Sequence, residues 1–354
     1  MVAPSVYLNE LLYIQLSENP SVGLQLWSNL FDRFLQQFDL SGCNQLLREV
    51  RRFDLESEFG VTVFILYKTS KGTLAAQTGD LKMAARMYES VLSVLPVEEA
   101  GWVLMNLGNV YYLAKQFEQA LHFYSQSREV YEKLEFLPGV AKVLINEGCV
   151  LRDCGKQTDA INLFEEASAL IPVDDIETQV INLSNWANAL HVVGKLDEAA
   201  NKYQQVLRLL AQTAAIHLQA QITGNLGVLY LDQGNLEKAI EFLEQDLSIQ
   251  TTLGDFLGQA ETLNNLGITY RKVGKISQAL DCYLRSAEIR NGSGDKLGEL
   301  TNLRNYVIAS HAQKLLVPEP ILTRAIQLAT QLDDTETIQW LQTNLFVINE
   351  TSEN

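Results

Sequence analysis

The sequence contains few of the residues from which active sites and metal sites are usually built. Histidine and cysteine each occur only four times in 354 residues, and no two cysteines form a CxxC pair. No HExxH pattern and no glycine-rich phosphate loop is present. Zinc binding and a disulfide framework are therefore not indicated. We expect a protein that is not an enzyme and that uses no metal or cofactor.

Long apolar runs and an excess of positive charge are also missing. The longest strongly apolar run, residues 61–67, is too short to span a bilayer, so we expect no membrane insertion. Forty-three acidic residues against 27 basic ones give a net charge of -16, which repels phosphate and argues against a nucleic-acid partner. The first residues show no basic segment followed by an apolar stretch, so the expected location is cytoplasmic.

What the sequence does contain is an internal repeat. The segment Asn-Leu-Gly-x-x-Tyr occurs at residues 106–111, 225–230 and 265–270, with degenerate copies at 146–151 and 185–190. An alanine follows the small residue of each copy by 12 residues, and an aromatic residue or leucine follows four residues later. A four-residue step on the same face indicates a second helix. The small residues lie 39 or 40 residues apart, at Gly108, Gly148, Ala187, Gly227 and Gly267.

Glycines separate the two helices of most copies. Gly155, Gly194, Gly234 and Gly274 lie where the first helix should end, and glycine adopts the left-handed conformation that ends a helix at little cost. Each unit is therefore predicted to be helix, turn, helix. Weaker copies occur upstream, around Gly72, and downstream, from Asn305, so we expect about seven units.

These residues resemble the tetratricopeptide repeat, in which a Leu-Gly pair, a tyrosine, an alanine and an aromatic residue recur on two antiparallel helices. The resemblance covers roughly residues 61–330, and the 40-residue period is similar to that of the Pins/LGN adaptors and kinesin light chain. It implies an all-α, right-handed superhelical solenoid of helix-turn-helix units with helical end caps. We expect an N-terminal helical cap over 1–56, the repeat array over 57–316, and capping helices with a polar tail over 317–354.

The N-terminal cap is predicted from aromatic and leucine residues at helical spacing, which can cover the exposed end of a repeat core. These residues are Trp27, Leu30, Phe31, Phe34, Leu35 and Phe38.

The resemblance places the first helix of each unit on the concave surface. When the small residue is counted as place eight, places two, five, six, nine, twelve and thirteen should face the groove. Asparagine occupies place six in six successive units, and an asparagine amide can both donate to and accept from the main chain of an extended peptide. Alternatively, these amides bond neighbouring side chains in a polar layer. We call this set the asparagine row: Asn106, Asn146, Asn185, Asn225, Asn265 and Asn305.

Other groove places carry charged or aromatic residues. Basic residues outnumber acidic ones there, so the concave surface is expected to be less acidic than the exterior. Arg271, Lys272 and Arg304 cluster in the last units, where they can pair with a ligand carboxylate or simply be solvated. Trp102 at place two and Tyr112 at place twelve offer apolar platforms, although a helix-capping contact is an equal alternative for Trp102.

Two function classes remain open from the sequence. One is a non-catalytic adaptor or scaffold that binds a peptide segment of a partner protein in its groove. The other is a peptide-responsive regulatory sensor that resembles the bacterial Rap proteins, in which helices precede the repeats. In both cases the expected partner is a protein or peptide.

Overall fold

The computed structural model describes residues 12, 16, 19–51, 60–211 and 213–350, and these residues form helices and no strand. The prediction of an all-α repeat fold is thereby confirmed. The expected boundary between residues 56 and 57 lies outside the described residues. None of the described helices is both long enough and apolar enough to cross a membrane.

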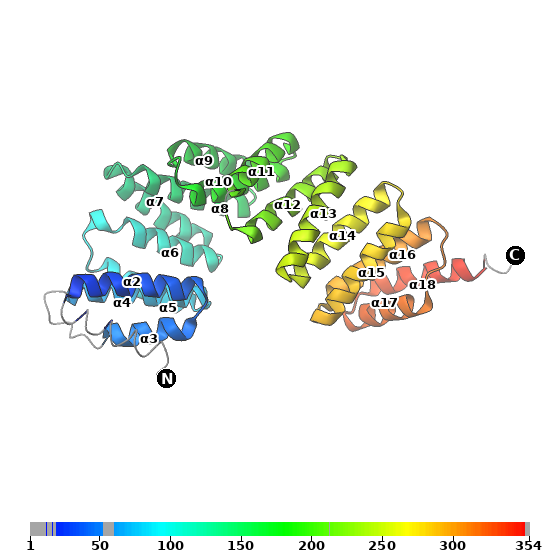
Figure 1. Ribbon diagram of the computed structural model, residues 1–354, viewed down its shortest axis with the longest axis horizontal. Coiled ribbons are helices and arrows are strands. Elements are labelled where there is room, and N and C mark those ends of the chain that lie inside the picture. The colour runs from blue at the N-terminus through cyan, green and yellow to red at the C-terminus, as the bar shows by residue number, and fades with distance from the viewer. Residues whose placement is uncertain (1–11, 13–15, 17–18, 52–59, 212, 351–354) are drawn as a thin grey trace. The chain divides into compact units, whose positions relative to one another are not determined.

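Helical hairpins follow one another along the chain (Figure 1). Two helices, α2 (Pro20–Gln36) and α3 (Leu40–Arg51), come first, and α18 (Thr335–Glu350) comes last. A short turn of 3-10 helix, η1 (Val97–Glu99), precedes the second hairpin. The hairpins are α4 (Gly60–Gln77) with α5 (Leu81–Leu92), α6 (Gly101–Leu113) with α7 (Phe117–Lys133), α8 (Leu137–Asp153) with α9 (Gln157–Leu170), α10 (Ile176–Val192) with α11 (Leu196–Leu210), α12 (Ile216–Asp232) with α13 (Leu236–Leu253), α14 (Phe256–Lys272) with α15 (Ile276–Ser293), and α16 (Lys296–Ala312) with α17 (Glu319–Gln331).

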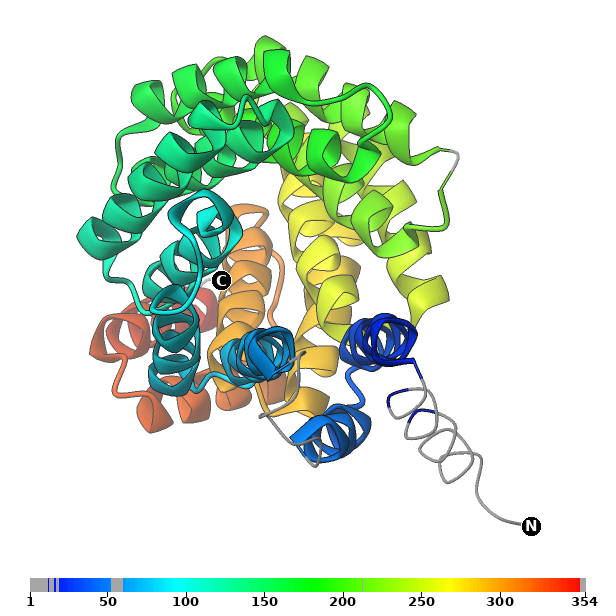
Figure 2. The same cartoon turned by 90° about the vertical axis from the view of Figure 1, so that its left-hand side faces the viewer.

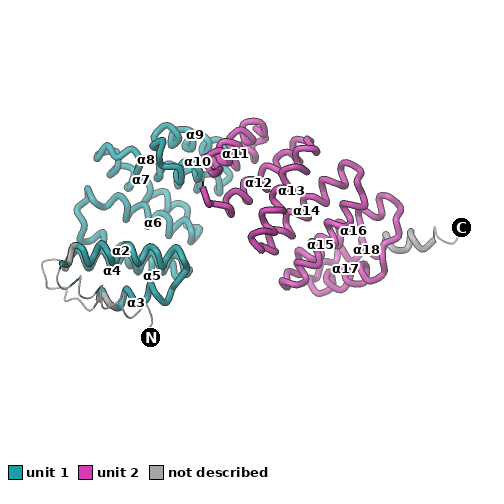
Figure 3. Tube along the Cα trace, in the orientation of Figure 1, with its two compact units in different colours: residues 1–182 teal, residues 183–354 magenta. Residues whose placement is uncertain are grey.

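The chain divides into two compact units, residues 1–182 and 183–354, and helix α10 runs through the division (Figure 3). Consecutive helices pack against each other from α2 to α9 in the first unit and from α11 to α18 in the second (Figure 2). Each unit therefore builds its own core from consecutive repeats.

The two helices of a hairpin approach most closely at place eight. A Cβ atom added to Gly148 would lie 2.6 Å from the ring of Phe164, and one added to Gly227 would lie 2.6 Å from Cγ of Leu243. Phe164 and Leu243 are fully buried. The repeating small residue therefore gives the large residue of the second helix its space, as the spacing predicts.

The turns between the two helices adopt the predicted left-handed conformation. The glycines at 155, 194, 234 and 274 have φ between 74° and 80°. In the hairpin of α6 and α7, where the chain has no glycine, Lys115 takes this conformation instead, with φ of 59°. Glycine at this point is therefore favourable but not required for the hairpin to form.

Helices α2 and α3 share a core with α4, which contributes Val63 and Leu74. The indole of Trp27 stacks on Phe31 at 5.1 Å between ring centroids and donates a 2.8 Å hydrogen bond to the carbonyl of Leu46. The sequence prediction was wrong for Phe38, whose side chain is 78% exposed. Helix α2 ends at Gln36, and Phe38 lies in the turn with φ of 54°, so it cannot continue the buried face.

Two glycines of the second unit allow a test of the turn geometry. Both Gly234 and Gly292 have open space where a Cβ would lie, but only Gly234 has positive φ. We expect Gly234→Ala to destabilise the protein by about 1–2 kcal/mol. Gly292→Ala lies near the end of α15 and should stabilise it by up to about 1 kcal/mol. Urea unfolding of both variants measures the difference, and shifts in the same direction would contradict this account.

Candidate functional site

Three buried tyrosine hydroxyls on second helices form hydrogen bonds with polar residues at place nine of the first helices. Burial deprives a hydroxyl of water, and it raises the pKa of Tyr203 to about 12. These hydrogen bonds were not predicted from the sequence. Their signal in the sequence was an asparagine directly after the small residue, at Asn109 and Asn188. The bonded pairs are Tyr88 with Thr73 at 2.8 Å, Tyr124 with Asn109 at 2.7 Å, and Tyr203 with Asn188.

All six members of the asparagine row are half-buried on the first helices of their hairpins. Three of them donate hydrogen bonds inside the protein, and two of these bonds go to side chains of the preceding hairpin, as in the polar layer that was the alternative to peptide binding. The bonds run from Nδ2 of Asn106 to the carbonyl of Trp102 at 2.9 Å, from Asn146 to Oδ1 of Asn109 at 3.1 Å, and from Asn305 to Oδ1 of Asn264 at 3.0 Å. Asn185 lies on α10.

Asn225 and Asn265 share a cavity of about 540 Å³ in the second unit. Its walls come from α12 and α14, the C-terminal end of α13, and residues at and beyond the end of α15. Asn225 also lies beside the hydroxyl of Tyr203. The side-chain amide of Asn265 forms no hydrogen bond with any described residue, so both its donor and its acceptor remain available.

The same cavity contains a buried carboxylate. Asp246 on α13 is only 4% exposed, and it accepts hydrogen bonds from Thr262 Oγ1 at 2.6 Å and Gln250 Nε2 at 3.3 Å. Burial raises the pKa of Asp246, and the nearby carboxylates of Glu261 and Asp255 raise it further, while the two hydrogen bonds lower it. Burial therefore has a desolvation cost for this carboxylate that no cation among the described residues offsets.

Asp246 was not among the predicted site residues, because groove places were counted on the first helices alone. The cavity wall is also more acidic than expected for the concave surface. Glu261 lies at groove place two, whereas Asp246 comes from a second helix and two others directly precede first helices, outside those places. The carboxylates of the wall are Asp246, Asp255, Glu261 and Asp295, with Arg290 as the cation.

The three basic candidates have separate surroundings. Arg271 lies beside the hydroxyl of Tyr283, where burial raises the tyrosine pKa to about 12 and the guanidinium lowers it. Lys272 is exposed at the end of α14. Arg304 is exposed on α16. The pKa of Asp334 is lowered mainly by hydrogen bonds from Thr337, and the positive charge of Arg304 lowers it further.

The aromatic candidates lie in the first unit. Trp102 is 37% exposed in the first turn of α6. Tyr112 is less free than expected, because its hydroxyl donates a 2.7 Å hydrogen bond to Asp153 of the next hairpin. Burial is the main reason that the pKa of Tyr112 is raised to about 12, and the hydrogen bond to this carboxylate is the second. Only the ring of Tyr112 is left for an apolar contact.

The sequence model of the tetratricopeptide repeat matches residues 99–172, 178–252 and 218–292, which together make up more than half of the chain. The chain belongs to the tetratricopeptide repeat family. No curated protein matches this tetratricopeptide repeat chain in sequence.

Several solved structures are similar in fold. The apo form of RapI is 14% identical with a TM-score of 0.68, and the match covers 93% of this chain and 98% of RapI. A Rap protein complexed with competence and sporulation factor is 16% identical with a TM-score of 0.57, over 95% and 98% of the two chains. The quorum sensor NprR of B. thuringiensis is 13% identical with a TM-score of 0.62, over 90% and 84%. At these identities the likeness establishes the fold alone.

The isolated carboxylate leads to a prediction about stability. The raised pKa of Asp246 means that the folded protein loses stability as pH rises from the ordinary value of 3.8 through the raised value. Asp246→Asn does not titrate. Relative to the wild type, its free energy of unfolding should therefore increase between about pH 4 and pH 7. Urea unfolding at both pH values measures this increase, and a difference independent of pH would contradict the assignment.

Glu147→Gln is the matched control for a buried carboxylate with a cation. Burial raises the pKa of Glu147 too, but Arg128 pairs with it at 3.0 Å and lowers that pKa. Removing this charge leaves Arg128 with only its longer pair to Glu132, at 3.8 Å, so the variant should lose stability at pH 7 where Asp246→Asn gains it.

Proposed function

We propose that this protein is a non-catalytic adaptor that binds a peptide segment of a partner protein along the groove face of its first helices. The observation that carries the proposal is the cavity shared by Asn225 and Asn265. Two amides from consecutive hairpins face one space, and that of Asn265 has no bond to any described residue. Such amides can bond a peptide main chain whatever the ligand sequence.

The spacing of the row fits an extended ligand. Packed helices lie about 8–10 Å apart and an extended chain rises about 3.3 Å per residue, so each asparagine would meet roughly every third ligand residue. In the second unit the row runs from Asn185 to Asn305. The four members in this unit would then address a segment of roughly ten residues.

The remaining groove candidates have narrower roles under this proposal. Arg271, Lys272 and Arg304 are assigned to a carboxylate of the ligand, because charge-assisted bonds to guanidinium are strong. Trp102 and the ring of Tyr112 are assigned to apolar contacts in the first unit. Asn106, Asn146 and Asn305 would have to exchange their internal bonds for ligand bonds. Asn225 is bonded to the hydroxyl of Tyr203 but lines the cavity, so it is assigned to the ligand together with Asn265.

A second candidate is a peptide-responsive sensor. It is favoured by the likeness to RapI and to the Rap protein complexed with competence and sporulation factor, which extends over more than 90% of each chain. A sensor changes conformation when its peptide binds, whereas an adaptor holds its partner without such a change. Small-angle scattering separates the two: a peptide-induced change in radius of gyration favours the sensor, and an unchanged value favours the adaptor.

Peptide binding itself can be tested with ligands selected from a random peptide library. We expect Asn225→Ala combined with Asn265→Ala to weaken binding about tenfold or more, since each lost hydrogen bond contributes about 0.5–1.5 kcal/mol. Isothermal titration measures the affinity. Asn265→Ala alone should leave the melting temperature unchanged, which separates binding from stability.

Asn201→Ala is the control, because Asn201 is an exposed asparagine on the second helix α11 of the same unit. It should bind the selected peptides as the wild type does. Equal affinity of the double variant and the wild type would reject the groove assignment.

A further inference from the structure

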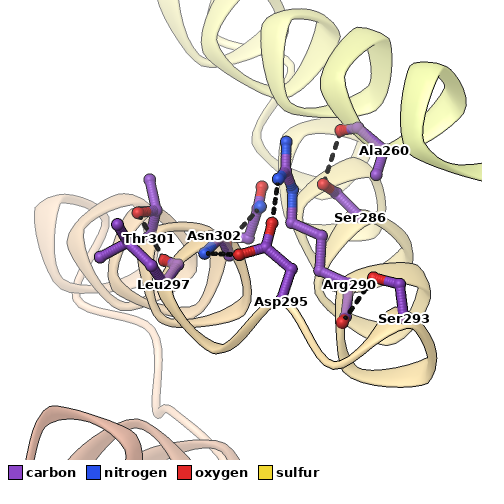
Figure 4. A network of polar contacts seen from close by, with 9 residues as sticks. Ala260, Ser286, Arg290, Ser293, Asp295, Leu297, Thr301 and Asn302 are labelled. Atoms are coloured by element: carbon purple, nitrogen blue, oxygen red, sulfur yellow. Dashed lines mark hydrogen bonds and ion pairs between the residues drawn. The ribbon is translucent and has the colours of Figure 1, made fainter. Parts of the chain in front are cut away.

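The cavity shared by Asn225 and Asn265 has an excess of negative charge at its wall. Of the carboxylates that line it, Asp295 forms an ion pair with Arg290, and Figure 4 shows this contact. The other three are Asp246, Asp255 and Glu261, and none of the ion pairs among the described residues includes them. Asp255 accepts from the backbone of Gly258 at the start of α14, and Glu261 is exposed.

Asp246 is the most buried of these carboxylates, with 4% of its surface exposed. Its two hydrogen-bond donors, Thr262 and Gln250, are neutral and bond different oxygens. A carboxylate has about four acceptor sites, so each oxygen keeps capacity for one further donor. A guanidinium group supplies two parallel N–H donors and a positive charge, which are the two things this group lacks.

Comparison between repeats shows that packing does not require an acid here. Asp246 follows Ala239 by seven residues, and serines hold the same place in two other hairpins. Ser127 donates to the carbonyl of Gly101 at 2.6 Å, and Ser286 donates to that of Ala260 at 2.6 Å, as Figure 4 shows for the second pair. An ionised carboxylate cannot donate such a bond, so Asp246 replaces a packing contact with a charge.

A glycine in the facing helix makes room for this charge. Gly224 lies in the middle of α12 at place five, where the other hairpins of the asparagine row carry larger side chains. A Cβ atom at Gly224 would lie 2.8 Å from Oδ2 of Asp246. Mid-helix glycine and an unpaired buried carboxylate are each unfavourable for folding, and here the two are in contact beside a cavity.

We infer that Asp246 and its cavity bind a cationic side chain of the peptide ligand, arginine in preference to lysine. This inference rests on the proposed function, because Asn225 and Asn265 would hold the main chain of the segment whose side chain meets Asp246. Arginine is preferred because its planar group can bond both carboxylate oxygens at once. Glu261 and Asp255 add attraction for a positive charge at the same cavity.

The test uses two tripeptides, acetyl-Gly-Arg-Gly-amide and the same compound with citrulline, which keeps the shape of arginine without its charge. Isothermal titration with the full chain should show about tenfold or more tighter binding of the arginine compound. Asp246→Asn should abolish the preference. Asp281→Asn, which removes an exposed carboxylate from α15, should retain it. Equal binding of the two compounds by the wild type, including no binding of either, overturns the inference.

Ethylguanidinium, which has no peptide bond, separates the inference from the function on which it rests. One outcome is that ethylguanidinium binds and Asp246→Asn abolishes this binding, while no library peptide loses affinity when Asn225 and Asn265 are replaced. The cation site is then supported, and groove binding of a peptide is rejected. If library peptides depend on the two asparagines but carry no preferred cationic residue, the proposed function stands and the cation site falls.

Discussion

The close approach of the two helices in each hairpin is the constraint on which the other features of this protein depend. Glycine or alanine at place eight removes the side chain that would separate the helices, and a large residue such as Phe164 or Leu243 fills the adjoining space. When that residue is tyrosine, its hydroxyl is carried into a buried region and needs a partner. The polar residues at place nine follow from this need, and one of them, Asn109, in turn accepts a bond from Asn146 of the next hairpin.

Spacing in the sequence was sufficient to predict the hairpins and their turns, because close packing and left-handed turns both require particular small residues at fixed intervals. The prediction was wrong for Phe38, since helical spacing does not show where a helix stops. It also missed the role of place nine, because a hydrogen bond between residues 15 positions apart depends on how two helices cross.

The candidate site was predictable only in part, for a related reason. Asn225 and Asn265 were found because they repeat, whereas Asp246 and Gly224 are significant because they depart from the repeat. A departure can be recognised from sequence, but its meaning depends on the contact between the two residues, which the sequence does not contain. Exceptions to the local rules of a fold are expected at functional sites, and Asp246 with Gly224 is such an exception in this repeat array.

The connections between hairpins show how firmly the length of a repeat is fixed. Helices α13 and α15 each have 18 residues and are followed by only two connecting residues, 254–255 and 294–295. Helices α9 and α11 have 14 and 15 residues, and longer connections, 171–175 and 211–215, follow them. A shorter second helix is therefore followed by a longer connection, and the next hairpin begins after almost the same number of residues. Residues can pass between helix and connection during evolution without changing the interval at which groove side chains recur.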